Sequence, residues 1–327
     1  MKSALVLGAG GFIGSHMVRR LKSEGFWVKG VDLKNPDFSS SAADEFLIGD
    51  LRDFAFVLKL IEQGDRLGQD FSQVYQFAAD MGGAGYIFTG LNDSEIMHNS
   101  ATINLNILQA IKKSSTTRTP PRIFYSSSAC IYPSVLQEDS SKVDLPEGLA
   151  YPANPDSEYG WEKLFSERLY LTFARNERFE VRVARYHNIF GPEGTWVGGK
   201  EKAPAAICRK VAETAPEGGE IEVWGDGNQT RSFLYIEECI DATRRLMESD
   251  VTGPINIGSE EMVSINELVQ ITAEIAKKTV STKHIDGPVG VRGRNSNNDM
   301  IRELLNWDYS MTLREGIEQT YQWISTQ

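Results

Sequence analysis

The sequence predicts an α/β protein built on a doubly wound parallel sheet, and three observations lead to that prediction. Short apolar segments alternate with helical patterns along the first half of the chain, a glycine-rich turn directly follows the first of these segments, and small polar residues follow a later one. Buried strands that alternate with helices are typical of a parallel sheet covered on both faces. Ligands bind such sheets outside the carboxyl ends of the strands.

The glycine-rich turn links the first expected strand, Ala4–Leu7, to a helical pattern that stops at Gly25. Gly8 and Gly11 allow a tight turn and let a diphosphate approach the backbone N–H groups at a helix N-terminus, and Gly14 allows the helix and strand to pack closely. We therefore expect a Rossmann-type dinucleotide site here. Its candidate residues in the turn are Gly8, Gly11, Phe12, Ile13 and Gly14.

The second expected strand, Trp27–Val31, ends in Asp32, eighteen residues beyond the last glycine of the turn. An acid at this distance accepts hydrogen bonds from the ribose diol of a bound dinucleotide. A carboxylate also repels a 2′-phosphate, so the sequence favours NAD over NADP.

Two further strand ends are candidates to contact the cofactor. The strand Glu45–Ile48 leads to Asp50 and Leu51, which either meet the adenine or begin a helix, with Asp50 as its N-cap. The strand Gln73–Phe77 runs into Ala78, Ala79 and a glycine pair that ends at Gly83. Small residues at a strand end let a cofactor lie close to the backbone, and we expect the glycines to belong to a ligand-contacting loop.

The fifth expected strand, Arg122–Ser126, opens into a cluster of hydroxyl groups and one thiol within the segment 124–133. The next helix is expected to start near Asp156 or Ser157, and it carries Tyr159 and Lys163, which lie four residues apart on one helix face. A phenol with a pKa of about 10 is a poor base at neutral pH, but a neighbouring ammonium favours its anion. An accidental pair on a solvated face is the alternative.

The pattern changes after a sixth strand at Val181–Arg185, where loop-like sequence and then a basic helix follow. We assign residues 1–186 to the dinucleotide-binding domain, with 233–258 returning to it. We assign residues 187–232 and 259–327 to a smaller C-terminal α/β lobe that binds the substrate. Further expected elements are strands at Ile221–Trp224, Phe233–Ile236 and Pro254–Ile257 and amphipathic helices at Asp93–Lys113, Ile265–Lys277 and Leu313–Ile324.

Composition limits the partners of the protein. There are 34 basic and 45 acidic residues, and the net charge of 34 − 45 = −11 argues against a nucleic acid or an anionic membrane as partner. The three cysteines, Cys130, Cys208 and Cys239, show no metal-type or disulfide-type pairing, which suits a reducing compartment. With no signal peptide or membrane-length apolar run, we expect a cytoplasmic protein without a metal site.

A set of motifs is spread over the whole chain: the glycines of residues 8–14, Asp32, Ser128, the Tyr159 and Lys163 pair, Gly225–Gly227 and Asn256–Gly258. With these motifs in this order the chain resembles the extended short-chain dehydrogenase/reductase family, which acts mainly on nucleotide-diphosphate sugars. Longer blocks narrow the resemblance to epimerases that act on a GDP-sugar: residues 79–83, 127–133, 185–189, 202–206, 224–233 and 291–296. The segment Asn99–Asn106 departs from the family pattern, so the family's helper asparagine is not assigned.

The resemblance implies a mechanism. Tyr159, assisted by Lys163 and Ser128, would remove the proton of the sugar C4 hydroxyl while hydride passes to NAD. The resulting ketone acidifies the hydrogens on C3 and C5, and the resemblance gives Cys130 and Lys202 the acid and base roles that invert both centres of GDP-mannose. Related dehydratases carry acidic residues just after the serine, where this chain has Ala129 and Cys130. Elimination of the C6 hydroxyl is therefore disfavoured.

The resemblance also implies contacts to the sugar and the diphosphate, and a homodimer. The candidate contacts are Gly83, Ser128, Cys130, Asn188, Glu201, Lys202, Lys210, Gln229, Arg292 and Arg294. Arginine suits phosphate oxygens because its planar fork donates two parallel hydrogen bonds. A buried apolar role is the alternative for a lone cysteine, and a solvated position is the alternative for a lone lysine or arginine. Cys208 and Cys239 lie on helical patterns, and we expect them to be structural.

Three other functions remain open at this point. The first is the same chemistry on another nucleotide sugar, such as GDP-glucose. The second is inversion of C4 alone, which has no need of Cys130 and Lys202. The third is a non-catalytic NAD-binding module, which should have lost Tyr159 or Lys163, whereas both are present.

Overall fold

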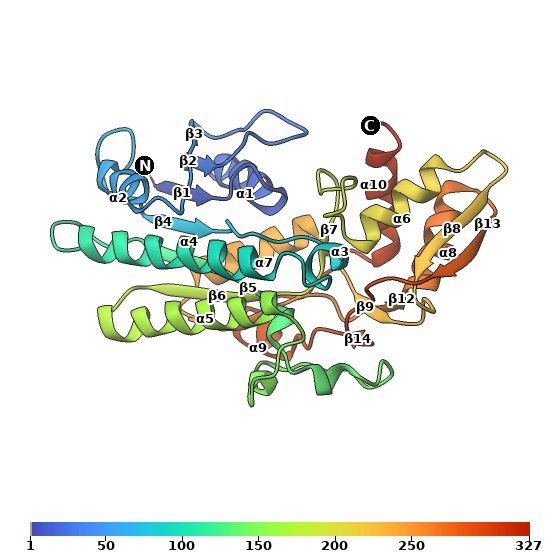
Figure 1. The fold of residues 1–327 in the computed structure, drawn as a ribbon. Helices are drawn as coiled ribbons and strands as arrows, with labels where there is room; N and C mark the ends of the chain where they lie inside the picture. Colours follow the sequence, from blue (N-terminus) through green and yellow to red (C-terminus); the bar gives the residue numbers. More distant parts are fainter. Residues whose placement is uncertain (1) are drawn as a thin grey trace.

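A computed structural model describes residues 2–327, and a seven-stranded sheet forms its centre (Figure 1). All neighbouring strands pair in parallel, in the order β11-β6-β5-β4-β1-β2-β3. Their bounds are β1 Ser3–Leu7, β2 Trp27–Asp32, β3 Glu45–Ile48, β4 Gln73–Gln76, β5 Arg122–Ser128, β6 Val181–Tyr186 and β11 Ile255–Ile257. The predicted Rossmann-type α/β class is therefore confirmed.

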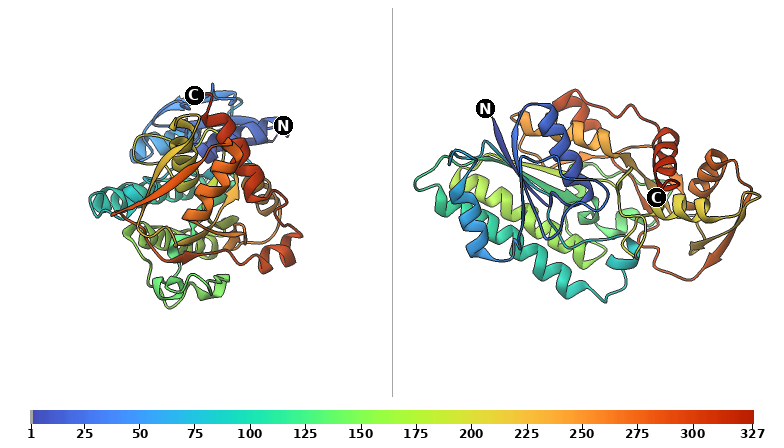
Figure 2. Two further views of the ribbon diagram at one scale, coloured as in Figure 1. Left: turned by 90° about the vertical axis from the view of Figure 1, so that its right-hand side faces the viewer. Right: turned by 90° about the horizontal axis from the view of Figure 1, so that it is seen from above.

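Helices cover both faces of this sheet (Figures 1 and 2). Helix α1 (Phe12–Ser23) packs against α7 (Ile236–Glu248) on one side, while α4 (Asp93–Ser114) lies between α2 (Phe54–Gln63) and α5 (Glu158–Glu177) on the other. Each helix turns an apolar stripe inward, and burying one large aliphatic side chain stabilises the fold by about 1.5–3 kcal/mol. None of the helices within 2–327 has the length and hydrophobicity needed to span a membrane.

The order of the strands places the ligand-binding edge. The chain runs outward from β1 to β3 and then returns to β4 on the other side of β1, so strand order reverses between β1 and β4. In doubly wound sheets this reversal opens a crevice at the carboxyl ends of the strands. The glycine turn after β1 and the hydroxyl cluster at the end of β5 therefore share one edge of the sheet.

The remaining elements form a second layer of structure beyond that edge, on the right of Figure 1. Helices α6 (Ala203–Glu213), α8 (Ile265–Ala276) and α10 (Leu313–Ile324) pack on one another, and two parallel strands, β8 (Gly219–Trp224) and β13 (Val280–Ile285), accompany them. The smaller elements are α3 Ala84–Ile87, α9 Asp299–Leu305, β7 Ile189–Phe190, β9 Thr230–Ser232, β10 Leu234–Tyr235, β12 Met262–Ser264, β14 Gly293–Arg294 and the 3₁₀ turns Ala129–Ile131, Ser134–Gln137 and Glu147–Ala150.

One local prediction was wrong: the loop expected at 186–192 contains the short strand β7, and the segment 225–232 contains another short strand, β9. Of the two roles left open for Asp50, the helix cap belongs to Asp53, whose side chain accepts from the N–H groups of Ala55 and Phe56. The two short strands escape sequence patterns because their partners are distant in the chain: β9 pairs with β12 and β14, and β7 with β10.

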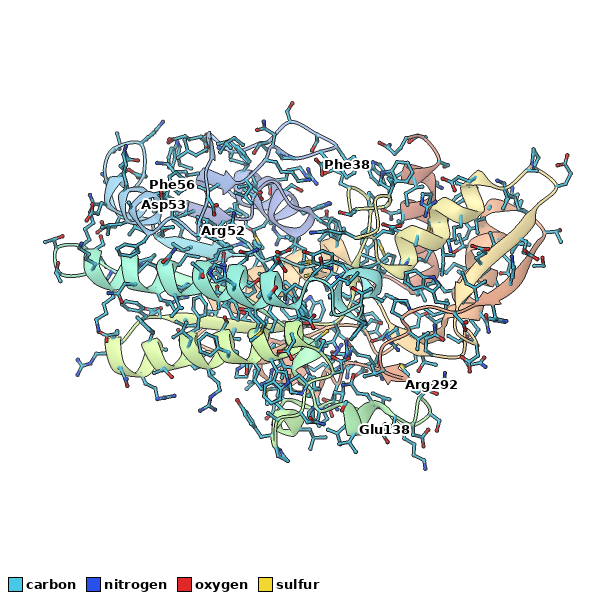
Figure 3. The ribbon with its side chains drawn as sticks, in the orientation of Figure 1. Phe38, Arg52, Asp53, Phe56, Glu138 and Arg292 are labelled. Carbon is cyan, nitrogen blue, oxygen red and sulfur yellow. The ribbon has the colours of Figure 1, made fainter. Side chains whose placement is uncertain are left out.

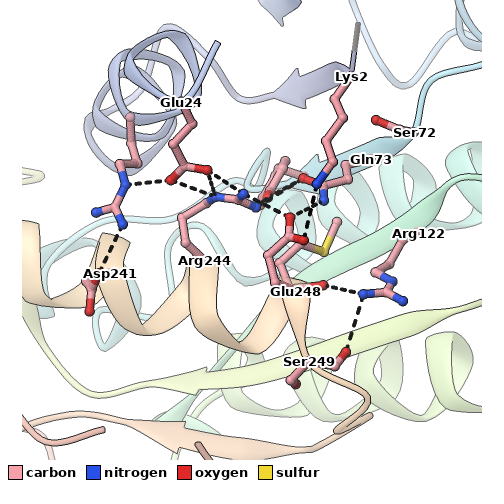
Figure 4. A network of polar contacts seen from close by, with 12 residues as sticks. Lys2, Glu24, Ser72, Gln73, Arg122, Asp241, Arg244, Glu248 and Ser249 are labelled. Carbon is pink, nitrogen blue, oxygen red and sulfur yellow. Dashed lines mark hydrogen bonds and ion pairs between the residues drawn. The ribbon is translucent and has the colours of Figure 1, made fainter. Parts of the chain in front are cut away.

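A buried arginine ties α7 to the opposite, amino-terminal edge of the sheet (Figure 4). Arg244 Nη2 lies 2.6 Å from Glu24 Oε2 at the end of α1 and 2.9 Å from Glu248 Oε1. Its Nη1 donates to Gln73 Oε1 at 3.1 Å and to the hydroxyl of Tyr75, both on β4. The polar groups that pair with this buried guanidinium thus come from the first third of the chain or from α7 itself.

Candidate active site

The turn after β1 has the shape that a dinucleotide diphosphate requires. Gly8 has φ +84°, and a Cβ added there would lie 2.7 Å from the backbone nitrogen of Ala78. A Cβ on Gly14 would lie 2.0 Å from the oxygen of Gly8. Gly11 is the N-cap of α1, no side chain caps this helix, and its first turn holds no carboxylate. The first N–H groups of α1, those of Phe12 and Ile13, therefore suit an anionic group.

Asp32 stands beside this turn. Its Oδ2 accepts a hydrogen bond of 2.9 Å from the N–H of Gly10, and its Oδ1 one of 3.4 Å from the N–H of Lys34. These contacts fix the carboxylate at the end of β2, where a ribose diol can donate to it. The residues of this edge fit NAD, and the carboxylate disfavours the 2′-phosphate of NADP.

The loop after β3 is held by asparagines of α4. Hydrogen bonds from Arg52 lower the pKa of Asp50, whose Oδ2 lies 2.7 Å from Arg52 Nη2. Arg52 Nη1 also donates to Asn99 Oδ1 at 3.0 Å, and Asn106 Nδ2 donates to the oxygen of Leu51 at 3.1 Å. Asp50 and Leu51 are thus positioned together at the side of the cofactor crevice.

Among the asparagines of α4, Asn104 is the one enclosed by the sheet. It accepts from Gln76 Nε2 at 3.0 Å and donates to Ser166 Oγ at 3.0 Å. Asn99 instead reaches Asp80 Oδ2 at 2.9 Å, beyond the end of β4. The three asparagines therefore contact three different parts of the structure.

Tyr159, Lys163 and Ser128 meet at the end of β5. The side chains of Tyr159 and Lys163 are buried, and Lys163 Nζ donates to the oxygen of Ser126 at 3.0 Å and lies 5.8 Å from the centre of the Tyr159 ring. Burial raises the pKa of Tyr159 above its ordinary value, while a hydrogen bond with Ser128 acts in the opposite direction. Burial also lowers the pKa of Lys163. The arrangement provides a phenol, a hydroxyl and an amine around one point.

Cys130 lies two residues beyond Ser128, in the 3₁₀ turn that Ser128 caps, and its sulfur accepts a hydrogen bond from a buried arginine. Arg294 Nη1 lies 3.0 Å from Cys130 Sγ. Its Nε donates to Gln137 Oε1 at 2.7 Å, and its Nη2 pairs with Asp156 Oδ2 at 2.8 Å. The guanidinium is thereby fixed on three sides and presents a donor to the sulfur. The hydrogen bonds of Gln137 and Asp156 with Arg294 were not predicted. The sequence assigned Asp156 only to the start of a helix and gave Gln137 no role.

Lys202 is the N-cap of α6 and carries no side-chain cap hydrogen bond. Burial lowers its pKa, and the sulfur groups that act on it electrostatically are those of Cys130 and Cys239. The structure therefore brings a partly exposed amine toward the same site as the Cys130 thiol. Cys208 and Cys239 are fully buried on α6 and α7.

The other candidate contacts are distributed around this centre. Gly83 lies against the backbone of Glu201, Asn188 donates to the oxygen of Ser232 at 2.9 Å, and Lys210 Nζ donates to the oxygen of Glu222 at 2.6 Å. Arg292 is exposed and pairs with Asp226 at 3.0 Å, on the outer side of β14 (Figure 3). Arg294, two residues further along the chain, is buried and donates to Cys130 instead. The two arginines therefore differ in both exposure and partner.

Arg231 is a cation that sequence reasoning missed. It donates to the carbonyl oxygens of Val289 and Val291 at 3.0 and 2.7 Å, and no carboxylate within residues 2–327 lies within ion-pair distance of it. Burial and the neighbouring Arg294 lower its pKa to about 9. A half-buried guanidinium beside a second, buried one suits an anionic ligand. Its signal was present in the block at 224–233, which served only to narrow the resemblance.

Several buried polar atoms near these residues lack a hydrogen-bond partner: His187 Nδ1, Gln229 Oε1, Ser232 Oγ and Asn295 Oδ1. Arg294 is in register with Arg231 in the β9–β14 pair, so Asn295 and Ser232 are the residues that follow them. Buried polar atoms in folded proteins are nearly always paired. These unpaired atoms indicate a place that a polar ligand completes.

Residues 4–258 match the model of the NAD dependent epimerase/dehydratase family, and the chain belongs to that family. It is 45% identical over 324 residues to GDP-mannose 3,5-epimerase of Arabidopsis thaliana, with 98% of this chain and 82% of that protein covered. It is equally 45% identical over 324 residues to GDP-mannose 3,5-epimerase 1 of Oryza sativa subsp. japonica, with 98% and 81% covered.

Solved structures show the same fold. UDP-glucose 4-epimerase of Thermotoga maritima aligns with a TM-score of 0.83 at 22% identity, covering 99% of both chains. UDP-glucose 4-epimerase of Thermus thermophilus, in complex with NAD, aligns with a TM-score of 0.81 at 21% identity, covering 98% of both chains. The predictions of an enzyme, of the epimerase type and of NAD as cofactor are confirmed.

Proposed function

We propose that the protein inverts C3 and C5 of GDP-mannose to form GDP-L-galactose, with GDP-L-gulose as the product of inversion at C5 alone. The observation that carries the proposal is the meeting of two groups at one site. Tyr159, Lys163 and Ser128 suit oxidation and reduction at C4. Cys130 follows Ser128 by two residues, and its thiol acts electrostatically on Lys202, so these two residues are the candidates for an additional acid and base. An enzyme that inverts C4 alone has no use for that second pair.

The first step is proton removal from the C4 hydroxyl. Bound NAD supplies the acceptor for the C4 hydride and later returns it. Tyr159 takes the hydroxyl proton, and Ser128 holds the C4 oxygen by its own hydroxyl. The contact of Lys163 with the Ser126 oxygen at 3.0 Å keeps the amine beneath the phenol. An ammonium at this position stabilises the phenolate that the step requires.

The second step exchanges protons on the neighbouring carbons. A ketone at C4 makes the hydrogens on C3 and C5 acidic, so each centre is inverted when a base removes the proton from one face and an acid returns one to the other. Cys130 and Lys202 supply these groups, and their assignment as acid or base stays open. The N–H of Arg294, 3.0 Å from Cys130 Sγ, stabilises negative charge on the sulfur.

The diphosphate of the substrate has its own candidate partners. Arg231 is half-buried and lies in register with the buried Arg294. The other candidates from the sequence are Lys210, Asn188, Glu201, Gly83 and Gln229. Arg292 takes a smaller part in the proposal because it is exposed and paired with Asp226. In this assignment residues 187–232 and 259–327 form the substrate lobe, and 1–186 with 233–258 form the NAD domain.

The test is incubation with GDP-mannose in deuterated water, followed by analysis of the product. We expect deuterium at both C3 and C5 and formation of GDP-L-galactose. Label at neither carbon would contradict the proposal. A changed C4 configuration without label would support the C4 epimerase, and turnover of GDP-glucose with GDP-mannose inert would assign the same chemistry to the other sugar.

We propose further that the enzyme is a cytoplasmic homodimer, with the α4–α5 face as the interface. Leu105 on α4 and Trp161 and Phe165 on α5 are 46%, 40% and 47% exposed, an unusual grouping of large apolar side chains on adjacent helices. The three free cysteines suit a reducing compartment. Sedimentation of the wild type should give the mass of a dimer, and sedimentation of Phe165→Glu should give the mass of one chain. A monomeric wild type would contradict the proposal.

A further inference from the structure

We propose that Lys200, Tyr86 and Asp80 are positioning residues that hold Lys202 in place for proton transfer. The inference deepens the proposed function and rests on it. Lys200 is two residues before Lys202, and both belong to the segment that leads into α6. None of the three residues contributes to the expected redox group of Tyr159, Lys163 and Ser128.

The three side chains form one compact cluster. Lys200 Nζ lies 3.9 Å from the centre of the Tyr86 ring and 3.6 Å from Asp80 Oδ1. The Tyr86 hydroxyl donates to the same Asp80 oxygen at 2.9 Å. Burial, together with this hydrogen bond, raises the pKa of Tyr86 to about 12, so the phenol remains a donor at physiological pH. The ammonium is attracted by both the ring face and the carboxylate.

The backbone adds a second attachment at the same place. The N–H of Gly83 donates to the oxygen of Lys200 at 3.0 Å. A Cβ on Gly83 would lie 2.1 Å from the oxygen of Glu201, so only glycine allows this approach. The loop after β4 and the segment before α6 are therefore joined by a backbone hydrogen bond and by the side-chain cluster.

Asp80 connects the cluster to α4, which packs against the main sheet. Its N–H donates to Ser100 Oγ at 3.0 Å, and its Oδ2 accepts from Asn99 Nδ2 at 2.9 Å. Both partners are on α4, which packs against the central sheet. The segment that carries Lys202 is thus anchored to the elements that hold the cofactor, although Lys202 itself begins a helix of the other layer.

A positioning role and a purely structural role of the cluster predict different results. An acid or base displaced by about 1 Å can lose about a hundredfold in rate. Loss of the cluster should therefore slow proton exchange at C3 and C5, while the chemistry at C4, performed by residues of β5 and α5, should proceed as before. A purely structural contribution would lower both together.

The experiment compares Lys200→Met and Tyr86→Leu with the wild type in two measurements. The first is deuterium incorporation from solvent into C3 and C5 of GDP-mannose, and the second is the rate at which the absorbance of bound NADH appears after mixing. We expect exchange to fall roughly 10- to 50-fold, with NADH formation within about twofold of wild type. Lys200→Arg retains the charge and the stacking on Tyr86, and should restore most of the exchange.

Lys283→Met is the matched control, because Lys283 is 51% exposed and paired with glutamates of β8, while Lys200 is 48% exposed. It should leave both measurements unchanged. The positioning role would be overturned if Lys200→Met lost deuterium exchange and NADH formation equally. It would also be overturned if Lys200→Met and Tyr86→Leu both exchanged hydrogen at the wild-type rate. A wild-type enzyme that forms NADH with GDP-mannose but exchanges neither hydrogen would overturn the proposed function, and this inference with it.

Discussion

Replacing Cys130 by alanine should abolish inversion of the sugar while leaving NAD bound. The substitution removes the sulfur that Arg294 contacts at 3.0 Å but leaves the turn after β1 and Asp32 untouched. General acid or base groups contribute about 10²–10⁴-fold to a rate. Deuterium incorporation at C3 and C5 should fall by that factor, and absorbance should still report NADH after GDP-mannose is added.

Cys208→Ala is the control for loss of a thiol. Cys208 is fully buried on α6, and burial raises the pKa of its thiol to about 12, so it stays a neutral core group. This variant should lose some stability and retain its exchange rate. If Cys130→Ala exchanges hydrogen as fast as the wild type, or folds without binding NAD, the acid–base role of Cys130 is wrong.

The second large effect is expected at Tyr159. Tyr159→Phe keeps the ring in its buried position but removes the oxygen that takes the C4 proton, so we expect NADH formation to fall by about 10²–10⁴-fold. Because burial raises the pKa of Tyr159, the phenol is protonated near neutral pH in the free protein. The rate should therefore increase with pH as the phenolate fraction grows, by up to about tenfold per unit.

Stopped-flow measurement of NADH between pH 6 and 9 gives this dependence directly. Lys163→Met removes the ammonium that favours the phenolate, so it should shift the rise to higher pH. Tyr151→Phe, at a half-exposed tyrosine before α5, should behave as the wild type. A rate that decreases as pH rises, or an unchanged pH profile in Tyr159→Phe, would exclude the phenol as the base.

The parts of the site that sequence could predict are those encoded by local spacing. The glycine turn, Asp32 and the Tyr159 and Lys163 pair lie within single strand–turn–helix units, where residue type and spacing determine the geometry. The end of β5 was found for the same reason, since an apolar strand followed by hydroxyls needs no distant partner to be recognised. The helices Asp93–Ser114 and Leu313–Ile324 followed from their apolar periodicity.

The parts that were missed depend on contacts between distant segments. Asp156 and Gln137 meet Arg294 only because the second layer of structure folds back on the catalytic strand. Arg292 and Arg294 lie in one glycine-flanked loop and look alike in sequence. Only the pairing of β14 with β9, which puts Arg294 in register with Arg231, makes Arg294 buried while Arg292 stays exposed. Strand β13 holds only half-buried and exposed residues, so it lacks the apolar signal of a core strand.

The late return of the chain to the sheet has a consequence for synthesis. The pairing surface of β6 is completed by β11, and Arg244 supplies the charge that Glu24 and Gln73 contact. The first domain therefore lacks this charge until residue 244 has left the ribosome, and it lacks β11 until residue 257 has done so. Until then Glu24 has only the neighbouring Arg20 of α1 to pair with, and one edge of β6 is open. Unpaired strand edges favour association between chains. The nascent polypeptide is therefore most vulnerable to aggregation before β11 emerges.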